Sequence, residues 1–269
     1  MSDLIAPLQS LHDIQLILCD VDGTLTNANG RGHSPRLMPL VRKIMQHGVK
    51  IGLVTGREAL AACVVHRIFD LNGPIIGENG AELILAPQED ERSTMTLGGL
   101  SPAQIDNIKQ RLVANGLLER LFIDHAKKFM LSLYPKEFPH HRPEALPGLC
   151  QRVVEALRDL NAELEISYSS AAIDISTKHV NKGAGIRKLC EVINLKLSAV
   201  AFVGDSSNDR AAFDCVGRGG GWLAFVGHDP AIKRALQDYP RVYYTRASAS
   251  EGAVEFLEYF SRHKNVQEH

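Results

Sequence analysis

Short apolar runs alternate with stretches of helical periodicity at the start of the chain. Residues 14–19 and 49–54 are apolar runs of strand length. Between them, residues 37–45 carry apolar side chains at helical spacing, and Gly48 follows as a stop signal. The next helical pattern covers residues 59–69. Strand–helix–strand–helix order at these lengths predicts a parallel sheet with helices on its faces.

The pattern changes in the middle of the chain. Residues 87–99 are polar and irregular, which indicates a boundary. A helix start follows, with Ser101 as cap, Pro102 at the first helical position and Gln104 at the third. The later signals are a strand, an amphipathic helix and two strands, at residues 129–134, 149–160, 163–168 and 172–176. This helix–strand–helix–strand–strand order predicts a small sheet covered by helices, and therefore a separate α+β lobe.

The first pattern resumes after this lobe. Residues 182–190 predict a helix, and residues 197–203 predict an apolar strand that ends in Gly204 and Asp205. Further strand and helix signals alternate to the end of the chain. We therefore expect a core built from residues 1–85 and 179–269, with an α+β lobe inserted at residues 86–178.

Composition mainly excludes classes of function. The chain has 269 residues, 45% hydrophobic and 23% charged, which is typical of a soluble globular protein. Its net charge of -1 lacks the positive field of a nucleic-acid binder. The five cysteines form no C-x-x-C pair, which indicates reduced thiols. Because no apolar run suits a signal peptide or a membrane span, we expect a cytoplasmic protein without membrane or nucleic-acid partners.

Three predicted strands end in polar turns that contain glycine: Asp20-Val21-Asp22-Gly23-Thr24, Thr55-Gly56-Arg57 and Gly204-Asp205-Ser206-Ser207-Asn208-Asp209. In an open parallel sheet, ligands bind beyond the carboxyl ends of the strands. If these strands are neighbours, four carboxylates, a hydroxyl and several free N–H groups converge on one point.

This set of groups suits phosphoryl transfer. Oxygen ligands, with no histidine or cysteine in the turns, favour Mg²⁺ over zinc. Thr55 and Gly56 offer a hydroxyl and a backbone N–H at a helix N-terminus, where anions bind. Asp20 ends the strand and is the candidate nucleophile, which would become an aspartyl-phosphate. Asp22 lies in the turn and is the candidate general acid and base.

Four segments together resemble the haloacid dehalogenase-like superfamily of phosphatases. They are DVDGT at residues 20–24, VTGR at 54–57, Lys182 in NKG, and GDSSND at 204–209. GENGA at residues 77–81 and the inserted lobe resemble the Cof-like branch. That branch includes sugar-phosphate, sucrose-phosphate, mannosylglycerate-phosphate and archaeal-type phosphoglycolate phosphatases.

The resemblance implies an α/β, Rossmann-like parallel-sheet core with helices on both faces, and an inserted α+β cap domain that sets specificity. It implies Asp20 as nucleophile and Asp22 as acid and base. Mg²⁺ would be held by Asp20, the Asp22 backbone carbonyl and Asp205, with Asp209 as a ligand directly or through water. The residues expected to bind phosphate or substrate are Thr55, Gly56, Arg57, Lys182 and Asn208, the last orienting either Lys182 or a phosphate oxygen.

We therefore expect a Mg²⁺-dependent phosphomonoester hydrolase that acts on a small phosphorylated metabolite. A phosphomutase would use the same core, and a phospho-accepting signalling module would share the aspartyl-phosphate. Asp22 argues against the signalling module, because an acid/base group hastens loss of the phosphate. Sugar phosphates and phosphoglycolate-like acids both remain open as substrates, since Lys127, Lys128 and Arg142 could meet an acidic leaving group. The sequence does not indicate an oligomeric state.

Overall fold

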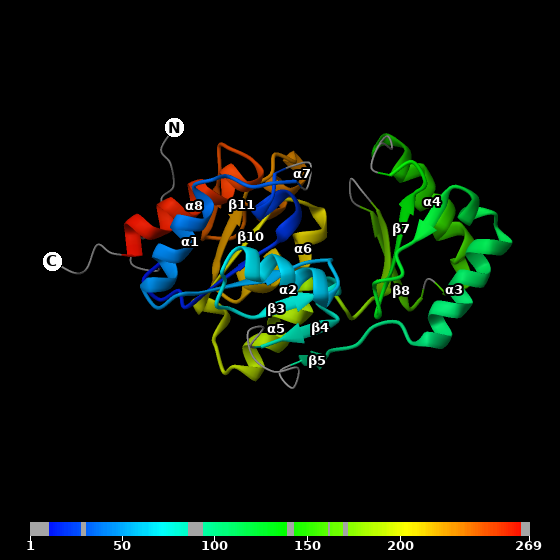
Figure 1. Ribbon diagram of the computed structural model, residues 1–269, viewed down its shortest axis with the longest axis horizontal. Helices are drawn as coiled ribbons and strands as arrows, with labels where there is room; N and C mark the ends of the chain where they lie inside the picture. Colours follow the sequence, from blue (N-terminus) through cyan, green and yellow to red (C-terminus); the bar gives the residue numbers. More distant parts are fainter. Residues whose placement is uncertain are drawn as a thin grey trace.

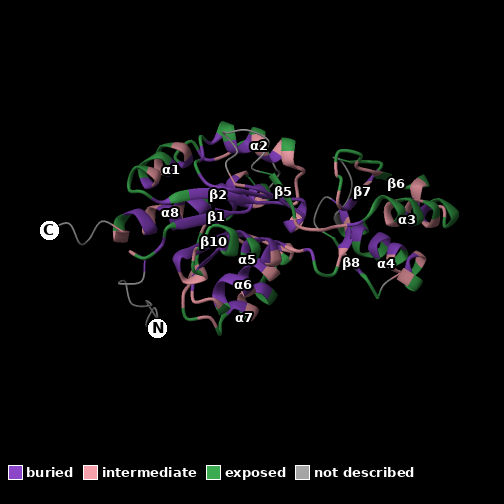
Figure 2. Ribbon diagram, turned by 90° about the horizontal axis from the view of Figure 1, so that it is seen from below, coloured by how far each residue is buried: buried purple, intermediate pink, exposed green. Residues whose placement is uncertain are grey.

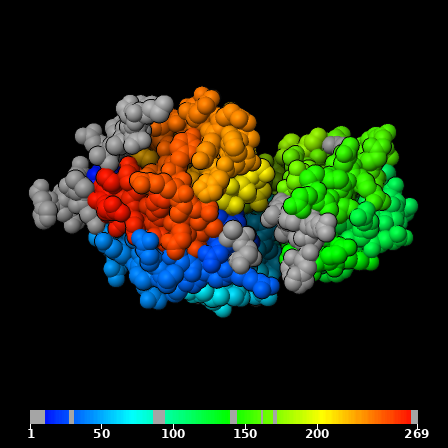
Figure 3. Space-filling model, turned by 90° about the horizontal axis from the view of Figure 1, so that it is seen from above, coloured from blue at the N-terminus to red at the C-terminus, as the bar shows by residue number. Residues whose placement is uncertain are grey.

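The computed structural model describes residues 11–27, 31–85, 94–138, 143–160, 162–168 and 172–264. Its strands form two sheets that belong to two lobes (Figure 1). The larger sheet has eight strands in the order β12-β11-β10-β1-β2-β3-β4-β5, and the smaller has four in the order β6-β7-β9-β8. Figure 3 shows the smaller lobe, in green, beside the larger one.

The larger sheet is parallel except at one edge. Its parallel strands are β1 (Leu16–Cys19), β2 (Lys50–Val54), β3 (Ile75–Gly77), β10 (Val200–Gly204), β11 (Trp222–Phe225) and β12 (Val242–Tyr244). Two antiparallel strands, β4 (Glu82–Ile84) and β5 (Thr94–Thr96), complete it. All four residues of β1 are buried, because helices cover both faces of the sheet.

Two layers of helices enclose this sheet (Figure 2). One face packs against α1 (Leu37–Gln46), α2 (Ala59–Ile68) and α8 (Ala249–Lys264). The other face packs against α5 (Lys182–Val192), α6 (Arg210–Arg218) and α7 (Pro230–Leu236). Strand β1 contributes Ile17 and Cys19 to the first core and Leu16 and Leu18 to the second, as alternation in a strand requires. The predicted α/β class with helices on both faces is confirmed.

The smaller lobe is an antiparallel sheet with helices on one face. Its strands are β6 (Leu121–Ile123), β7 (Leu131–Pro135), β8 (Leu164–Tyr168) and β9 (Ile173–Thr177). Its helices are α3 (Pro102–Ala114) and α4 (Leu146–Ala156), and they enclose an apolar core with one face of the sheet. The predicted capping box of Ser101 and Gln104 opens α3.

The structure differs from the sequence-based expectation at two strands of this region. The expected lobe, residues 86–178, includes β5, yet β5 pairs with β4 and extends the larger sheet. The expected order also lacks β6, whose three residues are too few to show alternation. Residues 86–93, which the sequence assigns to the lobe boundary, lie outside the described residues.

Short helical turns complete the described chain. They lie at Val21–Leu25, Glu78–Gly80, Leu117–Glu119, Pro143–Ala145, Arg158–Leu160, Leu197–Ala199 and Ser207–Asp209. Within the described ranges, no helix combines the length and the apolar character that a membrane crossing needs.

Candidate active site

The three polar strand ends meet at one edge of the larger sheet. Strand β1 lies between β10 and β2, and all three are parallel. Their carboxyl ends are followed by Asp20, Thr55 and Asp205. The prediction that these strands are neighbours is therefore confirmed, and the candidate residues lie beside the topological switch of the sheet.

A buried lysine joins two of the aspartates. Lys182 Nζ donates to Asp20 Oδ1 at 2.8 Å and to Asp209 Oδ1 at 2.6 Å. The side chains of these residues are 1%, 5% and 0% exposed, respectively. Lys182 is the first residue of α5, whose start is capped by the Asn181 side chain. The helix therefore fixes the ammonium group between the strand ends.

Asp209 uses its second oxygen to close the turn after β10. Its Oδ2 accepts from the backbone N–H groups of Asp205 at 3.0 Å and Ser206 at 3.2 Å. A Cβ atom at Gly204 would lie 2.6 Å from that oxygen, so the turn requires glycine. Both Asp209 oxygens therefore have hydrogen-bond partners in the fold.

The turn after β1 is fitted against Asp205. Thr24 Oγ1 donates to Asp205 Oδ1 at 2.9 Å. Gly23 has a φ of 81°, and a Cβ there would lie 2.7 Å from Asp205 Oδ2. Glycine and threonine therefore let this turn approach the carboxylate closely and orient it.

The clustered carboxylates form a site suited to a hard cation. Oxygen atoms of Asp20, Asp205 and Asp209 all lie within 4.8 Å of one another. Three carboxylates against the single ammonium of Lys182 leave two excess negative charges when all are ionised. Burial raises the pKa of Asp20 well above its ordinary value. Burial and the charge of Asp209 raise the pKa of Asp205 to about 7. An all-oxygen set with excess negative charge fits Mg²⁺.

The Asp22 carboxylate does not belong to this cluster. It accepts from Arg57 Nε at 2.9 Å and from a second Arg57 nitrogen at 2.5 Å, in a two-pronged ion pair. The Asp22 and Arg57 side chains are 50% and 34% exposed, so the pair lies at the rim of the site. The sequence predicts Arg57 as a phosphate or substrate ligand, whereas here its guanidinium holds the candidate acid/base group. The expected metal ligand at Asp22 is its backbone carbonyl.

The Thr55 turn differs from its expected setting. Helix α2 begins only at Ala59, and its N-terminus is capped by the Glu58 carboxylate. Thr55 and Gly56 therefore form a turn that precedes the helix, and they do not occupy its N-terminus. The buried Thr55 hydroxyl accepts from the Arg57 amide at 3.1 Å, which tightens this turn.

Asn208 also has a different partner from the one expected. Its Oδ1 accepts from Ser206 Oγ at 2.7 Å. Of the two predicted partners of Asn208, Lys182 or a phosphate oxygen, Lys182 is held by Asp20 and Asp209. The predicted role of Asn208 at a phosphate oxygen stays a prediction.

Two neighbouring residues of the GENGA segment were not assigned a role from the sequence. The buried Glu78 carboxylate accepts from the backbone N–H groups of Lys128 at 2.9 Å and Phe129 at 2.8 Å, across the two lobes. Asn79 Nδ2 lies 3.4 Å from Asp174 Oδ2 of the smaller lobe. The sequence signal that could have found them is an acid and an amide placed between an apolar run and a glycine. In the structure, both residues have a positive φ.

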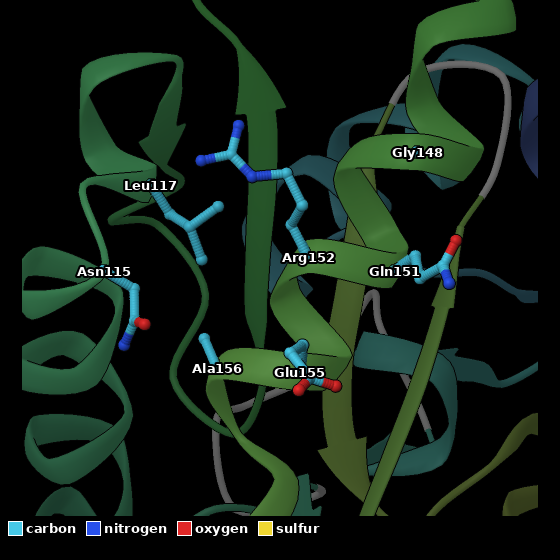
Figure 4. Close-up of a pocket in the computed structure, with 7 residues that line it drawn as sticks. All are labelled: Asn115, Leu117, Gly148, Gln151, Arg152, Glu155 and Ala156. Atoms are coloured by element: carbon cyan, nitrogen blue, oxygen red, sulfur yellow. The ribbon is translucent and has the colours of Figure 1, made fainter.

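A hollow of about 430 Å³ lies elsewhere, between the C-terminal end of α3 and one side of α4 (Figure 4). It is lined by Asn115, Leu117, Gly148, Gln151, Arg152, Glu155 and Ala156. These residues belong to the helical layer of the smaller lobe and include none of the predicted site residues. The hollow is therefore separate from the strand ends of the larger sheet.

Comparisons with known proteins identify the family of this chain. Residues 17–147 and 147–220 match the family model of haloacid dehalogenase-like hydrolases. A phosphoglycolate phosphatase of Methanosarcina acetivorans is 28% identical over 251 residues, which cover 90% of this chain and 95% of the relative.

Solved structures share the fold. A haloacid dehalogenase-like hydrolase from Bacteroides thetaiotaomicron superposes with a TM-score of 0.68 at 17% identity, covering 91% of this chain and 99% of that one. The sucrose-phosphatase from Synechocystis gives a TM-score of 0.60 at 17% identity, covering 92% and 98%. With the family model spanning most of the sequence, the chain belongs to the haloacid dehalogenase-like hydrolases.

Proposed function

We propose that this chain is a Mg²⁺-dependent phosphomonoester hydrolase that acts on a small phosphorylated metabolite through an aspartyl-phosphate on Asp20. The observation that carries the proposal is the buried ion cluster in which Lys182 bridges Asp20 and Asp209 beside Asp205. The names of the relatives, phosphoglycolate phosphatase and sucrose-phosphatase, support phosphate ester hydrolysis.

The first half of the reaction uses the groups around Asp20. An Asp20 oxygen attacks phosphorus, and the bond between phosphorus and the ester oxygen breaks. Asp22, separated from Arg57 and protonated, gives its proton to the departing oxygen. Lys182, the Thr55 hydroxyl and the Gly56 N–H stabilise the oxygens of the transferring group. Mg²⁺, held by Asp20, the Asp22 carbonyl and Asp205, would neutralise charge on that group.

The second half regenerates the enzyme. Asp22, now a carboxylate, takes a proton from water, and the resulting hydroxide attacks phosphorus. Inorganic phosphate leaves, and the Asp20 carboxylate and the protonated Asp22 are restored. In this scheme the smaller lobe acts as a cap that meets the leaving group, and the larger lobe performs the chemistry.

Phosphate release tests the proposal. The purified chain, assayed with p-nitrophenyl phosphate, should release phosphate with Mg²⁺ and not with EDTA. D20N should abolish release, and D22N should lower kcat by about 10²- to 10⁴-fold, the range of a general acid or base. The matched control is D70N, because Asp70 is an exposed aspartate paired with Arg42. Release by D20N at the unmodified rate, or interconversion of hexose phosphates without release, would contradict the proposal.

A further inference from the structure

The smaller lobe presents a polar face on the side away from its helices. Along β7, Leu131 and Leu133 enter the apolar core with α3 and α4, as does Ile173 on β9. Because side chains alternate along a strand, Ser132 of β7 and Asp174 of β9 lie on the opposite face. Figure 1 shows α3 and α4 on the outer side of this lobe, so the polar face is turned toward the larger lobe.

Three side chains on this face form a hydrogen-bonded chain, Lys127 to Ser132 to Asp174. Lys127 Nζ donates to Ser132 Oγ at 2.5 Å, and the Ser132 hydroxyl donates to Asp174 Oδ1. Lys127 Nζ lies 3.7 Å from the same Asp174 oxygen. The Lys127 side chain is only 6% exposed, whereas that of Asp174 is 17% exposed. The Asp174 carboxylate is therefore the more exposed of the two charges.

Asn79 connects this carboxylate to the catalytic turn. Its Nδ2 is 3.4 Å from Asp174 Oδ2, and its backbone N–H donates to the Thr55 carbonyl at 3.0 Å. A Cβ atom on Gly56 would lie 3.1 Å from Asn79 Oδ1. That buried oxygen has no hydrogen-bond partner within the described residues. One side chain thus separates Asp174 from the turn expected to hold the phosphoryl group.

An aromatic cluster adjoins the polar chain. Tyr134, two residues after Ser132 on β7, stacks on Phe122 with a centroid distance of 5.4 Å and meets Phe138 edge-on at 5.0 Å. Phe122 and Phe138 are each 41% exposed. Burial, followed by the charges of nearby carboxylates that include Asp174 and Asp22, raises the pKa of Tyr134 to about 12. The face therefore offers a neutral phenol and aromatic surface beside the Asp174 carboxylate.

The charge balance of the site disfavours an acidic leaving group. Lys182, Arg57 and Lys127 each already contact or closely approach a carboxylate. A carboxylate on the substrate would face Asp174 at short range, and like charges repel. A hydroxyl group would instead donate to Asp174, and hydrogen bonds to an ionised acceptor are the stronger kind. Apolar C–H surface of the same leaving group can pack on the exposed rings.

We infer that Asp174 is a specificity-determining residue, which with Lys127 and Ser132 selects an uncharged, hydroxyl-rich leaving group, such as a sugar or polyol, over one that carries a carboxylate. The inference rests on the proposed function, because it concerns the leaving group of the same hydrolysis. It favours one of the two substrate classes that the sequence leaves open. Lys127 was a candidate partner for an acid, but Asp174 already balances it. Of the other two candidates, Lys128 is exposed and its charge acts on Glu82, and Arg142 lies outside the described residues.

Matched substrate pairs test the selection. Glycerol 3-phosphate carries a hydroxymethyl group where 3-phosphoglycerate carries a carboxylate. Glucitol 6-phosphate and 6-phosphogluconate differ in the same way. For the full chain with Mg²⁺, we expect kcat/KM to be at least about tenfold higher for the hydroxymethyl member of a pair, as one charge-assisted hydrogen bond provides. D174N should reduce that ratio by about tenfold or more. The control D159N changes an exposed aspartate of the helical layer and should keep the ratio of the unmodified chain.

Two further measurements keep the outcomes distinct. Because D174N leaves the Lys127 ammonium without its counter-charge, the double variant K127M/D174N removes both charges and must show the same loss of preference. The inference is overturned if the unmodified chain prefers the carboxylate member of a pair, or if both folded variants keep the ratio of the unmodified chain. The proposed function still holds in either case, provided that the unmodified chain hydrolyses p-nitrophenyl phosphate. Failure of the unmodified chain to hydrolyse p-nitrophenyl phosphate overturns the proposed function and the inference with it.

Discussion

At the scale of single residues, Lys182 explains how three aspartates can share a buried site. Its ammonium contacts Asp20 and Asp209 and is itself 1% exposed. Burial alone would lower the pKa of this lysine, but the two carboxylates outweigh it and raise the pKa, so that the ammonium stays charged. An ion pair of this kind is costly to break, because the partner left behind is a buried, uncompensated charge.

Replacing Lys182 by Met should therefore destabilise the protein as well as inactivate it. Without Mg²⁺, we expect K182M to lower the free energy of unfolding by about 3 kcal/mol, the lower end for a broken buried pair. Urea unfolding followed by circular dichroism measures this change. K188M is the matched control in the same helix, because Lys188 is 48% exposed in its pair with Glu191. Equal stability of K182M and K188M would show that the pair does not hold the site together.

Gly204 gives a second test at this scale. A Cβ there would lie 2.6 Å from Asp209 Oδ2, so G204A should displace Asp209 and lower kcat. The control is G148A in α4, where an added Cβ meets nothing within 4 Å. Alanine favours helix over glycine, so G148A should raise the free energy of unfolding by about 0.5–1 kcal/mol and keep activity. Full activity in G204A would refute the close contact.

At the scale of elements, the sequence predicted most of the larger lobe. Long periodic helices and fully apolar strands are buried on defined faces, so their spacing alone indicates them. The sequence pattern failed where tertiary contacts determine the structure. Strand β5 has no buried residue that would mark it as a strand, yet it pairs with β4. The strand ends predicted that Asp20, Asp205 and Asp209 meet, and the family resemblance added Lys182. The Asp22–Arg57 pair and the Glu78 contacts were not predicted, because they depend on segments far apart in sequence.

Glu78 makes a prediction at this scale, because it joins the two lobes. Its carboxylate accepts from the Lys128 and Phe129 amides, so E78A leaves those N–H groups without their acceptor. We expect hydrogen exchange at these two amides to accelerate by at least about tenfold, the equivalent of one net hydrogen bond. E119A, at a residue exposed on the surface of the smaller lobe, should leave their exchange unchanged. Equal exchange in E78A and the unmodified chain would contradict the contact.

At the scale of the whole molecule, the carboxylate cluster links stability to pH and to cations. Asp205 has its pKa raised from 3.8 to about 7 by burial and by Asp209. The folded state therefore keeps a proton that the unfolded state releases, so this group makes stability fall as pH rises through that interval. A divalent cation must displace the proton, and it then compensates the buried charge.

Mg²⁺ should accordingly stabilise the protein more at pH 8 than at pH 6. We expect the increase in Tm on adding Mg²⁺, relative to EDTA, to be larger at the higher pH, because Asp205 is then already ionised. Thermal unfolding by calorimetry at the two pH values measures the difference. D205N should lose most of the Mg²⁺ effect, and D70N should retain it. An equal shift in Tm for D205N and the unmodified chain would exclude Asp205 as a ligand.

The assignment of Asp20 as nucleophile is the central claim, and trapping the phosphoenzyme tests it most directly. The D22N variant lacks the group that activates water, so the phosphoenzyme should accumulate in it. Its reaction with p-nitrophenyl phosphate is quenched in acid, and the peptides are analysed by mass spectrometry. We predict one phosphoryl group on the peptide that contains Asp20, and none in the double variant D20N/D22N. A phosphoryl group on any other residue would contradict the account. So would the absence of a phosphoenzyme together with a D20N variant that is as active as the unmodified chain.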